Sequence, residues 1–430
     1  MIRDDELLRA RIHEALDGVQ RPAPGLLRRC VAAAEHSSRA PRLRTVAIAA
    51  ALAAVAAAVV VLTLLQHSLS HGTPGPVQSP TPAPQQVLYT VDAGNDVVAL
   101  DAQSMRVLWR RSAGGAAPAA VTATGLLKLS ADERTLWVLP ISDPRGGTAL
   151  RAFDARTGTP GVTITLSGGA VYSTFAVDPR SGDIAAVGQD GTRILVSLVD
   201  PRRAQVLSTT ATRQLPPRAP LGSDLALDAV FTADGSRLYY SYGFANADRS
   251  GVDWADVSGA QLQPCRAQAA GAACAPGVGV GLALAGTTVV ASDTGNPAQL
   301  VTLGPDGAVR RRVATGLVGD AEGGVVVSRD GTTATVLGAC PNGGGVVRVD
   351  LAGGTAQPVA TPVSGAAAAP ETPCGVRATL LADGGIAVSR LDTGFAGANS
   401  PGTVAVVDAT GRILRQATLP AGVVDLAATP

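Results

Sequence analysis

The stretch STFAVDPRSGDIAAVGQDGTRILVSLVD, residues 173–200, contains the unit that decides the fold. It reads as an apolar strand, a tight turn, a second apolar strand, and a third strand that ends in Asp200. This order recurs seven times between Val87 and the C-terminus. The strand-end residue recurs as Asp101, Asp154, Asp200, Asp256, Asp350 and Asp408, with Gly304 in the fifth place.

Units of this kind cannot each bury a core, so they must stack, and their spacing of about 50 residues suits four-stranded blades. The sequence therefore predicts an all-β protein, a seven-bladed β-propeller over residues 87–430. Residues 423–430 read like the strand that opens other units, whereas residues 87–91 read like a second strand. We expect the C-terminal strand to complete the first blade. Six blades and a loose hairpin are the alternative.

The composition excludes a nucleic-acid-binding protein. The chain has 35 Lys and Arg residues against 34 Asp and Glu residues, and 3% of its residues are aromatic. It therefore lacks the basic surface and the stacking rings that nucleic acids require. The histidines are His13, His36, His67 and His71, all of which precede the propeller. An imidazole base or an imidazole metal ligand is thus excluded from residues 87–430.

Residues 46–65, VAIAAALAAVAAAVVVLTLL, form an uncharged run in which Thr63 is the one polar residue. A helix of this length spans about 30 Å, the thickness of the hydrocarbon core of a bilayer. Five Arg residues lie between positions 28 and 44, and no charged residue follows the run until Asp92. We predict a transmembrane helix over 45–66, with residues 1–44 in the cytoplasm and the propeller outside. A cleaved secretory signal is the rival interpretation, but some 45 residues precede the run.

The segments on either side of this run are short. Residues 1–44 combine apolar residues at helical spacing with Gly18, Pro22 and Pro24, which predicts two short helices. Their layout resembles the N-termini of anti-sigma-type membrane proteins, but His13 and Cys30 do not form a zinc motif. Residues 67–86 include GTPGPVQSPTPAPQQ and predict an extended linker.

Asp-Gly turns begin at Asp234, Asp330 and Asp383, each between two short apolar strands. This pattern resembles bacterial YVTN-type and WD-repeat-like propellers over about four fifths of the chain, and such propellers serve as binding platforms, assembly factors and enzymes. Residues 87–115, which include ALDA and a strand with Trp109, resemble one quinoprotein-type repeat. That repeat occurs once and the cysteines are never adjacent, so we expect no quinone and no other cofactor.

One predicted blade is rich in aromatic residues, which lie around a loop at residues 245–253. These residues are Tyr239, Tyr240, Tyr242, Phe244 and Trp254. The rings either pack between blades or form a contact patch on a propeller face. The candidate ligand-binding residues of that patch are Phe244, Asp248, Arg249, Asp253 and Trp254.

Asp92, Asn95 and Asp96 are oxygen-bearing residues close in sequence. They could contribute to a calcium loop, but their spacing departs from the calcium-binding pattern and favours a turn. We predict no metal site.

Four cysteines lie in the propeller region, outside the membrane in the predicted topology. We predict two disulfides, Cys265–Cys274 and Cys340–Cys374. The two other pairings and free thiols stay open as alternatives.

Together these patterns predict a single-pass membrane protein whose extracytoplasmic propeller acts as a binding, sensing or protein-interaction module. We expect the membrane and an extracytoplasmic protein or small molecule as partners, and no nucleic acid. The competing class is an extracytoplasmic propeller enzyme, lactonase-like or sugar-acting, that uses carboxylates and calcium.

Overall fold

The computed structural model describes the chain from Gln86 onward, with gaps. The described residues are 86–115, 125–142, 147–166, 169–214, 225–243, 251–265, 274–276, 281–293, 299–316, 324–328, 330–337, 346–359, 376–390, 401–408, 410 and 412–429. Within these ranges, no helix is long and apolar enough to cross a membrane. The cytoplasmic segment, the transmembrane helix and the linker lie outside the described residues and stay predictions.

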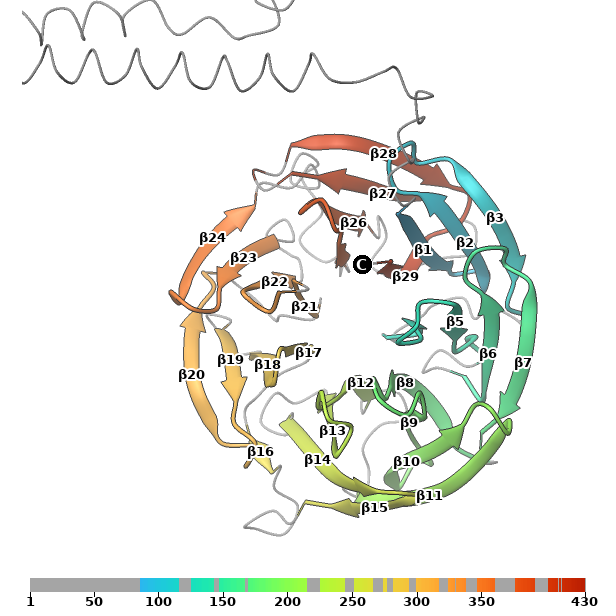
Figure 1. Ribbon diagram of the computed structural model, residues 1–430, viewed down its shortest axis with the longest axis vertical. Helices are drawn as coiled ribbons and strands as arrows, with labels where there is room; N and C mark the ends of the chain where they lie inside the picture. Colours follow the sequence, from blue (N-terminus) through green and yellow to red (C-terminus); the bar gives the residue numbers. More distant parts are fainter. Residues whose placement is uncertain are drawn as a thin grey trace, which may run out of the picture. The chain divides into compact units, whose positions relative to one another are not determined.

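The described strands form seven antiparallel sheets, each with a four-strand path from the axis of a ring to its rim (Figure 1). The inner strands contact one another in order round the ring, and the last returns to the first. The predicted all-β, seven-bladed propeller is confirmed. We number the blades 1 to 7 in chain order and name their strands from the axis outward.

Blade 1 consists of β29 (Val423–Ala428), β1 (Val87–Asp92), β2 (Asp96–Asp101) and β3 (Val107–Ser112). Blade 2 consists of β4 (Leu127–Leu129), β5 (Thr135–Val138), β6 (Ala149–Asp154) and β7 (Pro160–Thr165). Blade 3 consists of β8 (Val171–Val177), β9 (Ile184–Gln189), β10 (Arg193–Asp200) and β11 (Gln205–Gln214). Blade 4 consists of β12 (Leu225–Phe231), β13 (Arg237–Gly243), β14 (Gly251–Ser258) and β15 (Gln261–Pro264), and β16 (Ala275–Pro276) also pairs with β14.

Blade 5 consists of β17 (Leu282–Ala285), β18 (Thr288–Asp293), β19 (Gln299–Leu303) and β20 (Val309–Ala314). Blade 6 consists of β21 (Val325–Val327), β22 (Thr333–Leu337), β23 (Val346–Asp350) and β24 (Thr355–Val359). Blade 7 consists of β25 (Val376–Leu380), β26 (Ile386–Arg390), β27 (Gly402–Val407) and β28 (Ile413–Leu419).

The C-terminal strand completes the first blade. β29 pairs antiparallel with β1, with Tyr89 opposite Ala427. Beyond the pairing, the Thr429 hydroxyl accepts a hydrogen bond of 2.9 Å from the backbone N–H of Val87. The predicted closure is confirmed, and the alternative of six blades with a loose hairpin is wrong. Closure gives β1 a partner on its inner side, which would otherwise be an unpaired edge.

The recurring Asp residues hold the turns that follow the third strands. The Asp154 carboxylate accepts a hydrogen bond of 2.7 Å from the N–H of Thr157, and that of Asp350 accepts one of 2.9 Å from Ala352. In blade 5, where Gly304 stands at the strand end, Asp306 takes this role two positions later. Its carboxylate accepts a hydrogen bond from the backbone N–H of Ala308. Asp256 departs from the expectation because it lies within β14 and pairs with Arg237 at 2.6 Å.

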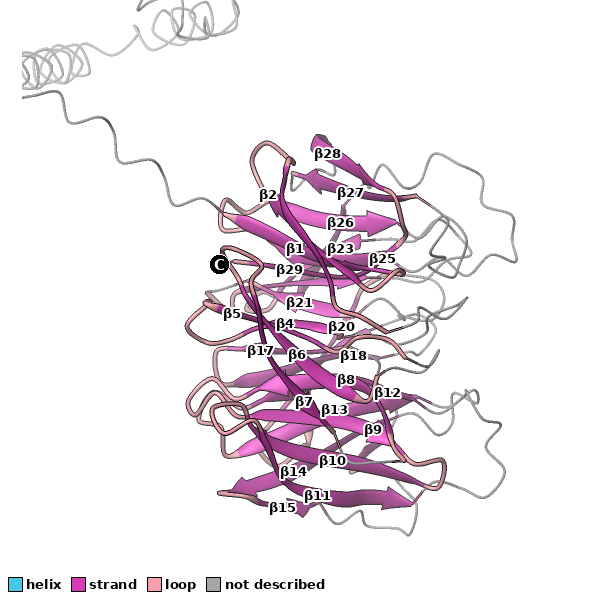
Figure 2. Ribbon diagram, turned by 90° about the vertical axis from the view of Figure 1, so that its right-hand side faces the viewer, coloured by secondary structure: helices cyan, strands magenta, loops and turns pink. Residues whose placement is uncertain are grey.

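Because neighbouring strands are antiparallel, the first and third turns of blades 2 to 7 and the third turn of blade 1 lie on one face of the ring, to the left in Figure 2. We call this side the turn face. The core lies between blades, where large side chains of one blade reach the next. The hydroxyl of Tyr89 in blade 1 donates a hydrogen bond of 3.0 Å to the carbonyl of Ala155 in blade 2.

The loop at residues 92–96 is a structural turn. One oxygen of the Asp92 carboxylate accepts hydrogen bonds from the N–H groups of Gly94 (2.8 Å) and Asp96 (2.9 Å). The other oxygen pairs with Arg110 at 2.8 Å. The buried Asn95 amide bonds the backbone N–H and C=O of Ile141 in the blade-2 region. These contacts favour the turn over the calcium loop.

The disulfide Cys265–Cys274 is present and joins residues nine apart in blade 4. This predicted pair is confirmed. Cys340 and Cys374 lie outside the described residues, so their pairing stays a prediction.

Candidate functional site

The candidate patch in blade 4 is described in part. Phe244, Asp248 and Arg249 lie outside the described residues, whereas Asp253 and Trp254 lie in β14. The rings of Tyr239, Tyr240 and Tyr242 on the neighbouring β13 are buried. These tyrosines pack between strands and blades, as the packing alternative expects.

Asp253 takes part in a buried ion pair. Its carboxylate accepts hydrogen bonds of 2.6 and 2.9 Å from two guanidinium nitrogens of Arg213 in blade 3. It also accepts a hydrogen bond of 2.9 Å from the backbone N–H of Cys274. Burial lowers the pKa of Arg213, but the bonds and charge of Asp253 outweigh that effect and raise the pKa. Arg213 also lies 4.6 Å above the ring of Tyr242. The pair therefore fastens blade 3 to blade 4.

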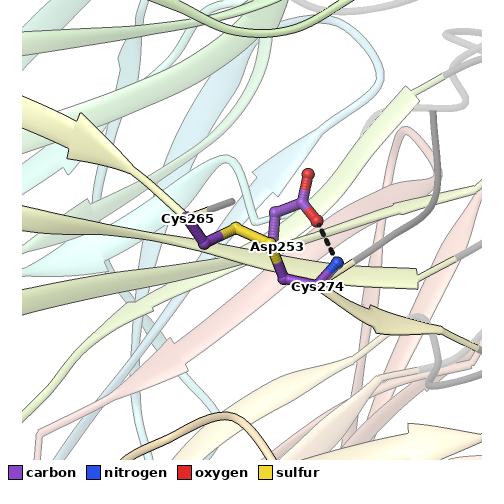
Figure 3. Close-up of side chains that lie close together, drawn as sticks. All are labelled: Asp253, Cys265 and Cys274. Carbon is purple, nitrogen blue, oxygen red and sulfur yellow. Dashed lines mark hydrogen bonds between the residues drawn. A yellow bond between two sulfur atoms is a disulfide. The ribbon is translucent and has the colours of Figure 1, made fainter. Parts of the chain in front are cut away.

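Asp253, Cys265 and Cys274 lie together in the close-up of Figure 3. Their potential ligand atoms are within 4.8 Å of one another, which is a spacing that a metal ion could bridge. The two sulfur atoms are bonded to each other, however, and a disulfide does not offer the thiolates that bind zinc. With the cysteines oxidised, the cluster is a disulfide cross-link beside the Arg213–Asp253 ion pair.

The blades can be compared position by position from the residue pair at which the first two strands meet on the turn face. Examples are Ser328 and Thr333 in blade 6, Ala285 and Thr288 in blade 5, and Thr429 and Val87 in blade 1. In each blade, the inner-strand residue two positions before this pair lies opposite one residue of the second strand. In blades 1 and 4 that second-strand residue is Tyr89 or Tyr239, and its side chain reaches the next blade. Tyr239 reaches the Gly304 carbonyl of blade 5 at 3.3 Å. In order from blade 1, the seven residues are Tyr89, Trp137, Ala185, Tyr239, Val290, Thr335 and Ala387. Thr335 is the one that is neither aromatic nor aliphatic.

A cavity of about 690 Å³ lies beside Thr335, between blades 6 and 7. We call it the 6/7 cleft. Val326, Leu380 and Ile386 form apolar walls, and Ala428 of blade 1 also lines it. Ser328 and other first-turn residues line it too, so it extends to the turn face. Its volume falls within the range of sites that bind small molecules.

The polar groups of the 6/7 cleft differ in how they are paired. Asp330 accepts hydrogen bonds from the hydroxyl of Ser328 (2.6 Å), and from the N–H (3.0 Å) and hydroxyl (2.8 Å) of Thr332. These bonds lower the pKa of Asp330 to about 2. Arg348 is exposed and makes no ion pair with any described residue. The buried hydroxyl of Thr335 has no hydrogen-bond partner among the described residues.

A second polar cluster lies on the inner strands. The ammonium group of Lys128 in blade 2 lies 3.5 Å from Asp228 in blade 4. The Asp425 carboxylate accepts a hydrogen bond of 2.9 Å from the backbone N–H of Leu127. The Asp228 carboxylate accepts one of 3.0 Å from the backbone N–H of Leu282. Burial lowers the pKa of Lys128, but Asp228 and Asp425 outweigh it and raise the pKa. The charges of these two carboxylates therefore favour the protonated amine.

Comparison with known proteins yields the fold. No protein-family model matches the chain, and no curated protein sequence matches it. The structure is similar to that of a candidate 6-phosphogluconolactonase from Bacteroides fragilis, with 17% identity, a TM-score of 0.56, and coverage of 82% of this chain and 100% of that chain. A candidate 6-phosphogluconolactonase from Bacteroides uniformis has 14% identity, a TM-score of 0.54, and coverage of 80% and 99%. At these identities the similarity shows the propeller fold alone.

Proposed function

We propose that this chain is a single-pass membrane protein whose extracytoplasmic propeller binds a small solute in the 6/7 cleft. The observation that carries the proposal is the cavity of about 690 Å³ with apolar walls, one exposed arginine and one unpartnered buried hydroxyl. An unsatisfied buried polar group costs about 1–3 kcal/mol, and a ligand that bonds it recovers part of that cost. The uncharged run at 46–65 and the arginines before it support the membrane anchor.

Binding is favoured over catalysis by the acid–base groups of the cleft. A general base works best when its pKa lies near the working pH. Asp330, the carboxylate in the described lining, has a pKa of about 2 and is occupied by its own turn. Residues 87–430 contain no histidine to replace it. The lactonase-like alternative is thus supported by the similarity of fold alone, and a fold does not by itself imply an activity.

A solute screen with two matched variants tests the site. We expect that small solutes raise the melting temperature of the full chain, and that Thr335→Tyr abolishes the shift because the ring fills the cleft. Thr418→Tyr adds the same side chain at an exposed position on β28 and should leave the shift unchanged. If no solute in a broad screen gives a shift that Thr335→Tyr removes, the proposed site is wrong.

The membrane topology is tested in intact cells. Protease added outside should remove the propeller, while a tag at Met1 survives in the cytoplasm. A propeller that stays protected until the membrane is opened would contradict the proposed orientation.

A further inference from the structure

The 6/7 cleft lies at a position that aromatic residues occupy in blades 1, 2 and 4, and smaller aliphatic residues in blades 3, 5 and 7. In blade 4, Tyr239 is flanked by Val230 on the inner strand and by Trp254 on the third strand. In blade 6, Thr335 is flanked by Val326 and by Arg348 in the same register. Thr335 therefore takes the place of Tyr239, and Arg348 takes the place of Trp254.

In blade 4, the two rings pack tightly against blade 5. Their centroids are 5.9 Å apart, and the Tyr239 hydroxyl reaches the Gly304 carbonyl at 3.3 Å. A Cβ atom added to Gly307 of blade 5 would lie 2.1 Å from the Trp254 ring. Between blades 4 and 5, the space at this register therefore holds an aromatic pair.

Blade 1 also contains a tyrosine–tryptophan pair, but its tryptophan lies on the fourth strand, whereas that of blade 4 lies on the third. Tyr89 and Trp109 lie on strands either side of β2, with ring centroids 6.0 Å apart. The Trp109 indole N–H and the Tyr89 hydroxyl both donate to the Ala155 carbonyl in blade 2, at 3.2 and 3.0 Å. Two interfaces of the ring therefore contain a tyrosine–tryptophan pair.

We propose that the 6/7 cleft binds an aromatic compound that carries an oxyanion, a carboxylate or a phosphate. This inference rests on the proposed function and names its ligand class. The ring lies in the space that Tyr239 fills in blade 4, against Val326, Leu380 and Ile386. The oxyanion pairs with Arg348, whose guanidinium presents paired N–H donors to such groups.

The other polar groups narrow the ligand further. The Thr335 hydroxyl offers one hydrogen bond at the buried end of the ring, so a phenolic hydroxyl suits that end. The Asp330 carboxylate near the turn face repels a second negative charge. A ligand with one oxyanion and one ring fits these constraints better than a polyanion does.

Titration calorimetry with the full chain tests the ligand class with matched probes. The probes are 4-hydroxyphenylacetate, the neutral analogue 2-(4-hydroxyphenyl)ethanol, and 4-hydroxyphenyl phosphate. We expect the neutral analogue to bind about ten- to a hundredfold more weakly than the better of the two anions, because it lacks a charge-assisted hydrogen bond. The ratio between the two anions tells carboxylate from phosphate.

Variants locate the contact. Arg348→Gln should weaken the anions about ten- to a hundredfold and leave the neutral analogue unchanged, whereas Arg106→Gln, an exposed arginine of blade 1, should change neither. Thr335→Tyr should abolish binding of all three. Equal affinity for neutral and anionic probes, or anion binding that survives Arg348→Gln, would overturn the ligand class.

The two proposals fail in different ways. If aromatic anions do not bind but other solutes give melting shifts that Thr335→Tyr removes, the ligand class is wrong and the binding site stands. If neither group of compounds responds to Thr335→Tyr, both are wrong. Should Thr335→Tyr not fold, the Arg348→Gln comparison decides the ligand class by itself.

Discussion

The interface of blades 4 and 5 and that of blades 6 and 7 share one backbone register but differ in what fills them. Tyr239 and Trp254 close the first, and the nearby Arg213–Asp253 pair and the Cys265–Cys274 disulfide brace blade 4. Thr335 and Arg348 leave the second hollow. A repeat fold fixes where side chains meet, and the side chains decide whether that place is packed or open. Interfaces of low packing are where proteins open and bind.

The largest expected effect comes from opening the ring, on which both interfaces depend. Deleting residues 421–430 removes β29, the inner strand of blade 1, and with it Ala428 in the cleft wall. We expect loss of a cooperative thermal transition by calorimetry, because β1 is left as an unpaired edge. Deleting residues 72–81 in the predicted linker removes as many residues and should leave the transition in place. A deletion of β29 that melts like the full chain would contradict closure as the source of stability.

Next in size is the difference between the residues at the common register. Tyr239→Ala should lower the free energy of unfolding by about 4 kcal/mol, since it leaves a cavity the size of a ring and removes the bond to Gly304. Thr335→Ala should cost about 1 kcal/mol or less, because its surroundings are already hollow. Denaturant titration of both variants measures the difference. Equal losses would mean that the 6/7 cleft is as well packed as its counterpart.

Substitution of Arg213 and of Arg348 should also differ in its cost to stability. Arg213→Gln leaves the buried Asp253 carboxylate without its cation and should cost about 3 kcal/mol. Arg348→Gln removes an exposed side chain with no described ion partner, so its cost should lie within about 0.5 kcal/mol. The same denaturant series gives both values. A large loss for Arg348→Gln would assign it a structural role in place of ligand binding.

The smallest effect concerns the turns, where the two blades should behave alike. Asp234 in blade 4 and Asp330 in blade 6 have pKa values of about 2, below the ordinary 3.8, because neighbouring hydroxyls and N–H groups bond the carboxylates. A lowered pKa stabilises the fold above pH 4, and that contribution is lost as the pH falls to about 2. Asp234→Asn and Asp330→Asn should each flatten the dependence of the melting temperature on pH between 4 and 2 by a similar amount. If the two variants changed the pH dependence by unequal amounts, the turns of blades 4 and 6 would differ in stability as well.

The fold could be predicted from the sequence because its signals are local and repeated. The Asp residue that ends a third strand bonds backbone groups two or three positions on, so each blade marks its own turn, and Cys265 and Cys274 lie close in the chain. The cleft could not be predicted in this way. Thr335 in TATVL reads as an ordinary strand residue until the seven blades are aligned from their first turns.

Asp253 shows the other limit of sequence reasoning. It is a candidate ligand residue by its place near aromatic residues, yet its carboxylate binds Arg213, 40 residues earlier on the rim of the preceding blade. Contacts between blades join residues whose separation varies with loop length, so spacing does not reveal them. Of the candidate patch, Phe244, Asp248 and Arg249 stay predictions.

Lys128 has a consequence for chemical labelling. It is the single lysine of the chain, so reagents or enzymes that acylate lysine side chains have one target here. The target is partly enclosed, with one third of its side chain exposed and its ammonium group beside Asp228. Acylation would remove the positive charge beside Asp228 and Asp425. The rate of labelling would therefore report how accessible this amine is beside Asp228, from one residue and without an engineered probe.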